Sequence, residues 1–200
     1  MKSIYTTEVF DAWFESLRDK QAARRIQARI DRAEEGNFGD CKPVGEGVSE
    51  MRIHFGPGYR VYFAQRGLEI VILLAGGDKG TQDKDIKIAL GLAQQTKEWQ
   101  MNNLKLRKWD SAEHLKTEED MALYFEACLQ EAGDDAAFLA KALGNIARAK
   151  GMSQLSRDTG LGRESLYKAL SGVGNPSFAT ILKVTVALGI HLHAQPATSA

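Results

Sequence analysis

Apolar and polar residues alternate along residues 49–66, SEMRIHFGPGYRVYFAQR. Successive side chains of a strand point to opposite faces, so the pattern predicts a hairpin of two strands around the turn Gly56–Gly58. One face is apolar and is expected to face a core: Met51, Ile53, Phe55, Tyr59, Val61 and Phe63. The other face carries Arg52, His54, Arg60, Tyr62 and Arg66, which together suit a polyanion.

The next segment, residues 69–75, is almost wholly apolar and does not alternate. This pattern indicates a central strand covered on both faces, although a buried helical turn would look the same. Gly76-Gly77 is expected to end the strand. A helix is predicted from about Asp83 to Trp99, because Ile86, Ala89, Leu90 and Ala93 share one helical face.

Helical spacing also organises the N-terminal residues. After a short strand at 2–6, Thr6 or Thr7 is expected to cap a helix that ends near Leu17. Asp19 is expected to cap a second helix that ends near Glu35. On this second helix a separate stripe, expected to be solvated, carries Arg25, Arg29 and Arg32.

Residues 40–47 can add a short edge strand that Pro43 interrupts. Residues 1–100 therefore read as an α+β domain of order β-α-α-β-β-β-α, with helices packed on an antiparallel-rich sheet. Residues 101–200 read as an all-α domain. The two meet without a Pro/Gly/Ser linker at Gln100-Met101, as two reading frames joined naturally or artificially would.

The second domain begins with a polar strand or arm at residues 104–116. Thr117 is expected to cap a helix that ends near Ala132, and Asp134 or Asp135 the next helix, to about Ala149. Three short helices are predicted to follow, the first capped by Ser153 and the last by Ser177. A final strand over the segment HLHAQ is also considered.

Composition excludes several classes of protein. Lys plus Arg and Asp plus Glu number 26 each, and they balance within each half, so any nucleic-acid contact must come from local patches. Without an 18-residue apolar run or a secretory signal, a cytoplasmic protein with no membrane contact is expected. Cys41 and Cys128 lack the spacing of metal ligands, and no metal or cofactor is expected.

Residues 153–172 have the spacing of a helix-turn-helix, with Leu155, Leu166 and Leu170 facing inward and Gly160 in the turn. A major groove admits the second helix of such a pair, and helix termini bind phosphate. The residues expected to contact DNA are Ser153, Gln154, Arg163, Glu164, Ser165, Tyr167, Lys168, Asn175 and Ser177. The alternative is an ordinary bundle with polar helix faces.

The pattern S-Q-x-x-S-x-x-x-G-x-x-R-x-S-x-Y-x-x-L-S-G, followed by N-P-S-F-x-T-I-L-K, resembles the Cro/phage-repressor class. Over residues 101–195 the chain resembles the HigA-like addiction module antidote family. That resemblance implies a homodimeric antitoxin that binds operator DNA and represses its own transcription.

The first half, through SEMRIHFGPGYRVYFAQRG and IVILLAGGDKGTQDKDIKIA, resembles the HigB-like addiction module killer toxins of the RelE/ParE superfamily. The resemblance implies ribosome-dependent cleavage of mRNA, inhibited while the antitoxin half is bound within or between chains. Some members of the superfamily poison gyrase instead. A transcription regulator with a non-catalytic first half is the other alternative. If the first half is a ribosome-dependent toxin, the alternative to a solvated arginine stripe is a contact with ribosomal RNA phosphates.

RNA cleavage needs no protein nucleophile, because the 2′-OH can attack the adjacent phosphorus. The candidate catalytic residues are Arg52, His54, Arg60, Tyr62, Lys79, Gln82 and Lys84. The arginines suit phosphate binding and His54 suits acid–base work. Tyr62 can stack on a base or merely cover the sheet, and Lys79 can clamp phosphate, act as base or only solubilise a loop. The arm Asn102–Lys116 is the candidate antitoxin contact with the toxin half.

Overall fold

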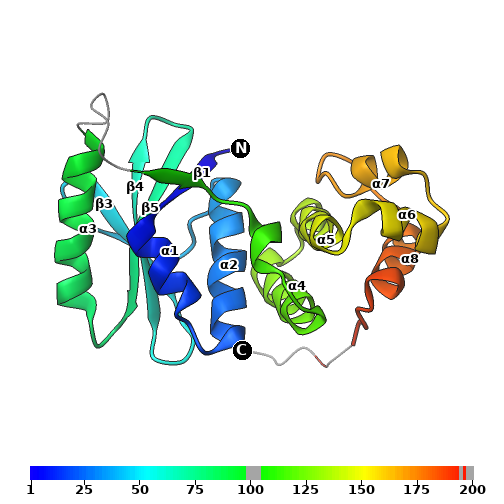
Figure 1. Cartoon of the computed structure of the whole chain (residues 1–200), viewed down its shortest axis with the longest axis horizontal. Helices are drawn as coiled ribbons and strands as arrows, with labels where there is room; N and C mark the ends of the chain where they lie inside the picture. The colour runs from blue at the N-terminus through cyan, green and yellow to red at the C-terminus, as the bar shows by residue number, and fades with distance from the viewer. Residues whose placement is uncertain (98–104, 194–195, 197–200) are drawn as a thin grey trace. The chain divides into compact units, whose positions relative to one another are not determined.

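The computed structural model describes residues 1–97, 105–193 and 196. The chain forms two compact units, Met1–Ser111 and Ala112–Ala200. The first is a mixed α+β unit and the second is helical (Figure 1). The α+β class predicted for the first half and the helical class predicted for the second are therefore confirmed.

The first unit contains a six-stranded sheet of order β2-β3-β4-β5-β1-β6. Its strands are β1 (Ser3–Thr7), β2 (Cys41–Gly45), β3 (Val48–Ile53), β4 (Tyr59–Arg66), β5 (Ile70–Asp78) and β6 (Leu106–Lys108). Its helices are α1 (Glu8–Glu15), α2 (Lys20–Glu34) and α3 (Gln82–Lys97). Only β1 and β5 pair in parallel; the other neighbours are antiparallel.

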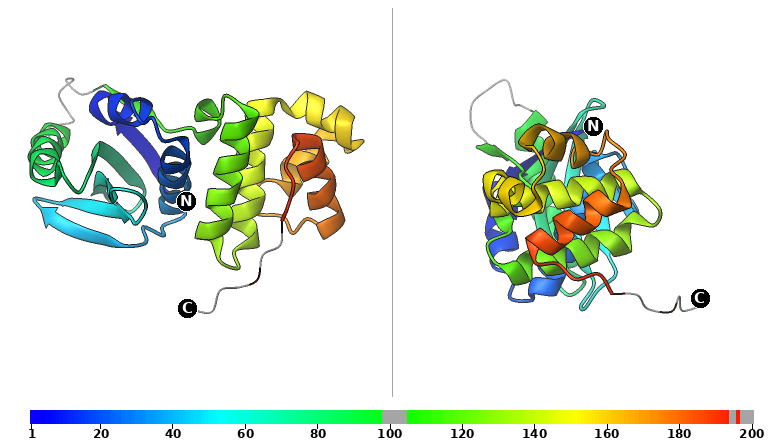
Figure 2. Two further views of the ribbon diagram at one scale, coloured as in Figure 1. Left: turned by 90° about the horizontal axis from the view of Figure 1, so that it is seen from below. Right: turned by 90° about the vertical axis from the view of Figure 1, so that its right-hand side faces the viewer.

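Helices cover both faces of this sheet (Figure 2). Against α1 and α2 packs a cluster that includes Met51, Ile53, Val61, Phe63, Val71 and Leu73. Against α3 packs a second cluster, which includes Val48, Tyr62, Ala64, Ile72 and Leu74. The hairpin and its apolar face are as the alternation predicts, and β5 is covered on both faces, as its continuous apolar run predicts.

Helices α1 and α2 both begin at the expected capping residues. The side chain of Thr7 accepts a hydrogen bond from the backbone N–H of Phe10 at 3.2 Å, and that of Asp19 accepts one from Ala22 at 3.0 Å. Each bond satisfies an N–H that the first helical turn leaves without a partner. The Thr7 hydroxyl also donates to the carbonyl of Leu74 at 2.6 Å, which ties the start of α1 to β5.

The prediction that β5 ends at Gly76-Gly77 is wrong, because the strand continues to Asp78 opposite Tyr59 of β4. Both glycines are needed within the strand. A Cβ at Gly76 would overlap the ring of Trp13, and one at Gly77 would overlap the carboxylate of Asp85. Glycine therefore lets α1 approach one face of the strand and α3 the other.

The first unit extends beyond the boundary predicted at residue 100. Residues 106–108 form β6, which pairs antiparallel with the outer edge of β1 (Figure 1). The polar strand or arm expected at 104–116 is thus a strand of the first unit's sheet, followed by a short 3₁₀ helix, η1 (Ser111–His114). Trp99, Gln100 and Met101, where the two halves were expected to join, lie outside the described residues.

The second unit consists of five α-helices among its described residues. They are α4 (Glu118–Ala132), α5 (Ala136–Lys150), α6 (Met152–Thr159), α7 (Arg163–Ala169) and α8 (Phe178–Leu188). Thr117 and Asp120 form a capping box at α4, and Asp135 caps α5. Ser177 caps α8 through a bond from the N–H of Thr180.

Two local predictions for the second unit are wrong. Ser153 does not cap α6: Gly151 occupies the cap position without a side-chain bond, and Ser153 lies within the helix. Residues 191–193 form no strand, and Ala194 and Gln195 lie outside the described residues. Within the described ranges, no helix has both the length and the apolar character needed to cross a membrane.

Candidate functional site

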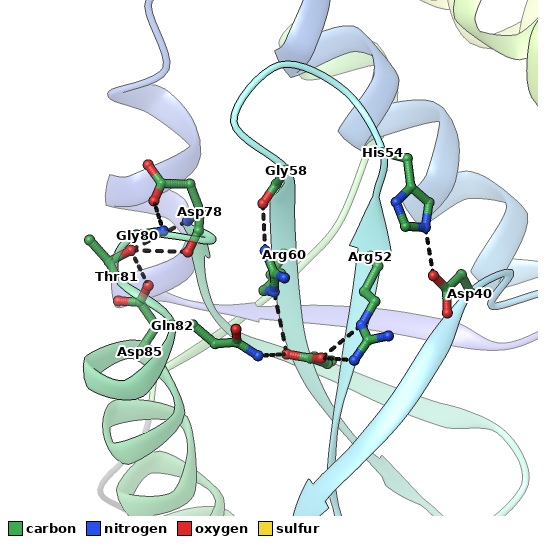
Figure 3. Close-up of polar contacts among 11 residues, drawn as sticks. Asp40, Arg52, His54, Gly58, Arg60, Asp78, Gly80, Thr81, Gln82 and Asp85 are labelled. Carbon is green, nitrogen blue, oxygen red and sulfur yellow. Dashed lines mark hydrogen bonds and ion pairs between the residues drawn. The ribbon is translucent and has the colours of Figure 1, made fainter.

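Glu50 lies at the centre of a polar cluster, because it contacts Arg52, Arg60 and Gln82; Figure 3 labels these three partners. Oε1 of Glu50 accepts a hydrogen bond from Nε of Arg52 at 2.8 Å and is 2.7 Å from the terminal Nη2 of that residue. Its Oε2 accepts from Nε2 of Gln82 at 2.9 Å and is 3.6 Å from Nε of Arg60. We call Glu50, Arg52, Arg60 and Gln82 the Glu50 cluster. Glu50 itself is 1% exposed.

The strand register explains the cluster. Arg52 and Arg60 are direct partners on β3 and β4, so their side chains leave the sheet on the same face. Glu50 is two residues before Arg52 and therefore shares this face. Gln82 is the first residue of α3, which begins beside the ends of these strands. Glu50 was not among the residues predicted for the site, although its position along the strand has the same parity as that of Arg52.

The cluster has a net positive charge, because two guanidinium groups share one carboxylate. The hydrogen bond to Glu50 raises the pKa of Arg52 above its ordinary value, so this guanidinium stays charged. The side chain of Arg52 is 31% exposed, whereas that of Arg60 is 12% exposed. Arg52 is thus the member through which an anion in solution can reach the cluster.

The hairpin turn orients Arg60 and brings Lys79 close. Nη1 of Arg60 donates to the carbonyl of Gly58 at 2.7 Å. Cβ of Lys79 lies 3.9 Å from the place that a Cβ would occupy at Gly58. Lys79 is exposed and follows β5 directly. Its charge can therefore add to that of the arginines at this end of the sheet.

His54 forms a dyad with Asp40. Nε2 of His54 lies 2.6 Å from Oδ2 of Asp40, and the side chain of His54 is 76% exposed. His54 comes directly after the end of β3, two residues after Arg52, and Figure 3 shows its contact with Asp40. The carboxylate of Asp40 orients the imidazole, as an acid–base histidine requires. Asp40 is a second residue that the sequence analysis did not find.

Tyr62 is not available to stack on a base, so that prediction is wrong. Its side chain is fully buried beneath α3, within the second apolar cluster. Its hydroxyl has no hydrogen-bond partner among the described residues. Burial, assisted by the charges of Glu50 and Asp85, raises the pKa of Tyr62 to about 12. The phenol therefore stays neutral near pH 7.

Two other cationic residues lie apart from the Glu50 cluster. The guanidinium of Arg66 donates to the carbonyl of Ala93 at 3.2 Å and to the hydroxyl of Thr96 at 2.8 Å, near the end of α3. It was expected on the polyanion surface but serves the packing of α3. Lys84 is exposed and follows Gln82 by two positions, which is a rotation of about 200° around α3, so it points away from the cluster.

The arginine stripe of α2 is not the solvated face that was expected. The guanidinium of Arg25 lies 4.5 Å from the ring centroid of Phe55. Arg32 pairs with Glu35 at 3.2 Å, and its side chain is 11% exposed. Arg29 is also only half-exposed. These side chains pack on the protein because their long stems cover apolar surface.

The second unit presents a separate polar surface on α6, α7 and the start of α8. Leu155, Leu166 and Leu170 are buried as expected, and Gly160 ends α6 with a φ of 67°. Every residue predicted to contact DNA is exposed: Ser153, Gln154, Arg163, Glu164, Ser165, Tyr167, Lys168, Asn175 and Ser177. Gln154 also bonds to Asp158 and Arg157 on the same helix.

Within the residues that the structure describes, no group of three or more His, Cys, Asp or Glu side chains is placed to hold a metal ion. The side chains of the Glu50 cluster offer positive charge for an anion, and the dyad of His54 and Asp40 offers a group for proton transfer.

Two family models match the chain, one in each half. Residues 12–98 match the family model "Phage derived protein Gp49-like (DUF891)". Residues 105–196 match the model "Probable addiction module antidote protein". These are the two kinds of domain that a toxin–antitoxin module combines. No solved structure matches the chain.

Two proteins of Haemophilus influenzae (strain ATCC 51907 / DSM 11121 / KW20 / Rd) are close relatives, both described only as "Uncharacterized protein". One is 53% identical over 92 residues, which are 46% of this chain and 93% of the relative. The other is 52% identical over 91 residues, which are 46% of this chain and 92% of the relative.

Proposed function

We propose that this chain, which belongs to the same family as the two Haemophilus influenzae proteins, is a type II toxin–antitoxin pair carried on one polypeptide. The first unit is an endoribonuclease that cleaves mRNA on the ribosome. The remaining residues are an antitoxin that keeps this activity inhibited and binds operator DNA. The two family matches, one on each half, support the pairing.

The nuclease activity is proposed mainly because Arg52 and Arg60 lie side by side and both contact Glu50. A guanidinium can bind two phosphate oxygens at once, so a fixed pair suits the charge that develops on phosphorus during cleavage. Glu50 orients both groups and leaves a net positive charge. Lys79, at the neighbouring strand end, adds a further cation.

In the reaction the 2′-oxygen forms a bond to the adjacent phosphorus while the bond from phosphorus to the 5′-oxygen breaks. The 2′-hydroxyl loses its proton, and the departing 5′-oxygen gains one. His54 is the proposed proton carrier, because Asp40 orients its ring and its exposed side chain can reach bound RNA. Arg52 is proposed to hold a non-bridging phosphate oxygen. Gln82 and Arg60 position Glu50 and Arg52 rather than transfer a proton.

The DNA-binding part rests on α7 and the ends of its neighbouring helices. Arg163, Ser165 and Tyr167 are exposed along α7, where side chains of a recognition helix would meet base edges. Homodimerisation is proposed through α8, because Phe178, Leu182 and Val186 form an exposed stripe at helical spacing and are 71%, 40% and 72% exposed. A dimer would read two half-sites of a palindromic operator.

Cleavage of translated mRNA tests the proposed function. Residues 1–111 are added to a translation reaction, and cleavage sites are mapped with and without ongoing translation. Cuts that require translation are expected, and they should be lost in the Arg52→Ala/Arg60→Ala variant. Uncut mRNA with the folded protein contradicts the nuclease assignment. DNA breaks without mRNA cleavage would identify a gyrase inhibitor instead.

A further inference from the structure

The segment Leu106–Ser111 belongs to the antidote-like sequence, yet it lies within the toxin-like unit. The antidote match begins at residue 105, whereas the compact first unit ends at Ser111. We call residues 105–111 the arm. The arm contacts the rest of the first unit in three ways: through strand pairing, through an aromatic side chain and through a buried carboxylate.

Strand pairing fixes the register of the arm on β1. Leu106, Arg107 and Lys108 pair with Thr7, Thr6 and Tyr5. The N–H of Trp109 then donates to the carbonyl of Ile4 at 3.0 Å. Without the arm, β1 would present an open edge of backbone groups, which is a ready template for an added strand.

Side chains make this register specific. Leu106 packs against the cluster on the α3 face, whereas Trp109 enters the cluster on the α1 and α2 face. Trp109 is 8% exposed, and its ring lies edge-on to those of Phe10 and Phe14 at centroid distances of 6.1 and 5.4 Å. A slip of one residue would turn both side chains to the wrong faces.

The arm ends on polar residues of α2. Nε1 of Trp109 donates to Oδ1 of Asp31 at 3.2 Å, and the hydroxyl of Ser111 lies 2.5 and 2.7 Å from the two carboxylate oxygens. Nε2 of Gln27 donates to the carbonyl of Ser111 at 2.9 Å. Asp31 and Gln27 are 3% and 0% exposed, so the arm satisfies groups that are otherwise costly to bury.

We propose that the β1 edge, together with the slot formed by Phe10, Phe14, Gln27 and Asp31, is a docking surface for the arm of an antidote. The recognised segment is Leu-x-x-Trp-x-Ser, present here as Leu106, Trp109 and Ser111. Docking does not depend on the covalent link through residues 98–104. A separately encoded antidote with this segment therefore binds the same surface. The names toxin and antidote rest on the proposed function, but the docking does not.

The arm holds the antidote without covering the Glu50 cluster. In the sheet, β6 is separated from β3 and β4 by β1 and β5, and Trp109 lies on the opposite face from Arg52. The arm therefore supplies affinity, and inhibition requires residues beyond Ser111.

The test uses the full chain with a protease cleavage site placed within residues 98–104. After cutting, the association of the two fragments is measured by light scattering and by dilution. The fragments are expected to stay together. Trp109→Ala should raise their dissociation constant roughly 100-fold or more, as expected for a buried aromatic anchor. Lys108→Ala, at the exposed residue directly before Trp109 in the arm, should change it less than about threefold.

A competing peptide tests the surface without a variant protein. A large excess of the peptide of residues 105–115 should displace the antidote fragment from the cut wild-type chain, and the same peptide with Trp109→Ala should not. Circular dichroism before cutting establishes that the variant chains are folded. The proposal is overturned if the fragments separate on cutting, if Trp109→Ala matches Lys108→Ala, or if the wild-type peptide displaces nothing. None of these readouts depends on toxicity.

Discussion

The hydroxyl of Ser111 lies 2.5 Å from Oδ1 and 2.7 Å from Oδ2 of Asp31, a carboxylate that is 3% exposed. The two residues come from segments that different family models match. Sequence similarity and physical packing therefore divide the chain at different places. The last strand of the first unit's sheet is supplied by the antidote-like sequence.

Removal of the Ser111 hydroxyl should destabilise the first unit. Ser111→Ala leaves a buried carboxylate with one donor fewer, so the free energy of unfolding of residues 1–111 should fall by about 1–3 kcal/mol. Urea denaturation measures the change. Ser16→Ala is the control, because its exposed hydroxyl donates to the nearby carbonyl of Trp13, and its effect should stay within about 0.5 kcal/mol. Equal effects of both variants would refute the role given to Ser111.

Neutralisation of Glu50 should affect both stability and catalysis. Glu50→Gln removes the charge that pairs with Arg52 and Arg60, and the partly exposed Arg52 limits the loss of stability to about 2 kcal/mol. Cleavage should slow more than tenfold, because both arginines lose their orientation. Glu46→Gln is the matched control, since exposed Glu46 accepts a bond only from Gln94 among the contacts described. Unchanged cleavage by Glu50→Gln would contradict the positioning role.

The buried hydroxyl of Tyr62 predicts an unusual gain of stability. Tyr62→Phe removes a polar group that has no described partner, so the free energy of unfolding should rise by about 1 kcal/mol, while cleavage persists. Tyr124→Phe, which removes a hydroxyl that accepts from Asn145 at 2.9 Å, should destabilise the second unit. Loss of cleavage in the folded Tyr62→Phe variant would show that the hydroxyl takes part in the reaction and would contradict its buried, structural role.

At alkaline pH, the free energy of unfolding should distinguish the wild type from Tyr62→Phe. The pKa of Tyr62 rises from 10.0 to about 12 on folding, so the unfolded chain loses this proton first. The contribution of Tyr62 to stability is complete below pH 10 and is lost as pH rises from 10 to 12. Relative to Tyr62→Phe, the wild type should lose roughly 2–3 kcal/mol over that range in urea titrations. Parallel curves for the two proteins would contradict the raised pKa.

Operator binding should depend on the exposed start of α7. Arg163→Ala should weaken specific DNA binding by about 1–3 kcal/mol in fluorescence titrations of the full chain at fixed salt, because an arginine contact with a base edge is lost. Lys116→Ala removes the same charge from an exposed site before α4 and should cost much less. Equal losses for both variants would indicate only a general electrostatic contribution.

Local rules of sequence were sufficient for much of the fold. Alternation placed Met51 and Val61 on one face of the hairpin. A short polar residue before apolar residues at helical spacing located the caps Thr7 and Asp19. These features depend on residues close in sequence. Buried Tyr62 shows the limit of the same rule, because alternation assigns a face but does not say that α3 covers it.

The missed residues depend on distant parts of the chain. Glu50 becomes the centre of a cluster only when β3, β4 and α3 meet, and Asp40 reaches His54 across 14 positions. Trp109 and Asp31 are 78 positions apart, so neither residue signals the other in sequence. The arm was expected to contact the toxin half, but its register and its Trp109 slot required the folded sheet.

Growth of bacterial cells tests the central claim, that one chain carries both a toxin and its antidote. The comparison uses residues 1–111, which keep β6 on the edge of β1, the full chain, and residues 1–111 with Arg52→Ala/Arg60→Ala, all at equal expression. Residues 1–111 are expected to arrest growth, whereas the full chain and the double variant allow it. Normal growth with folded residues 1–111, or equal arrest by the double variant, would contradict the account.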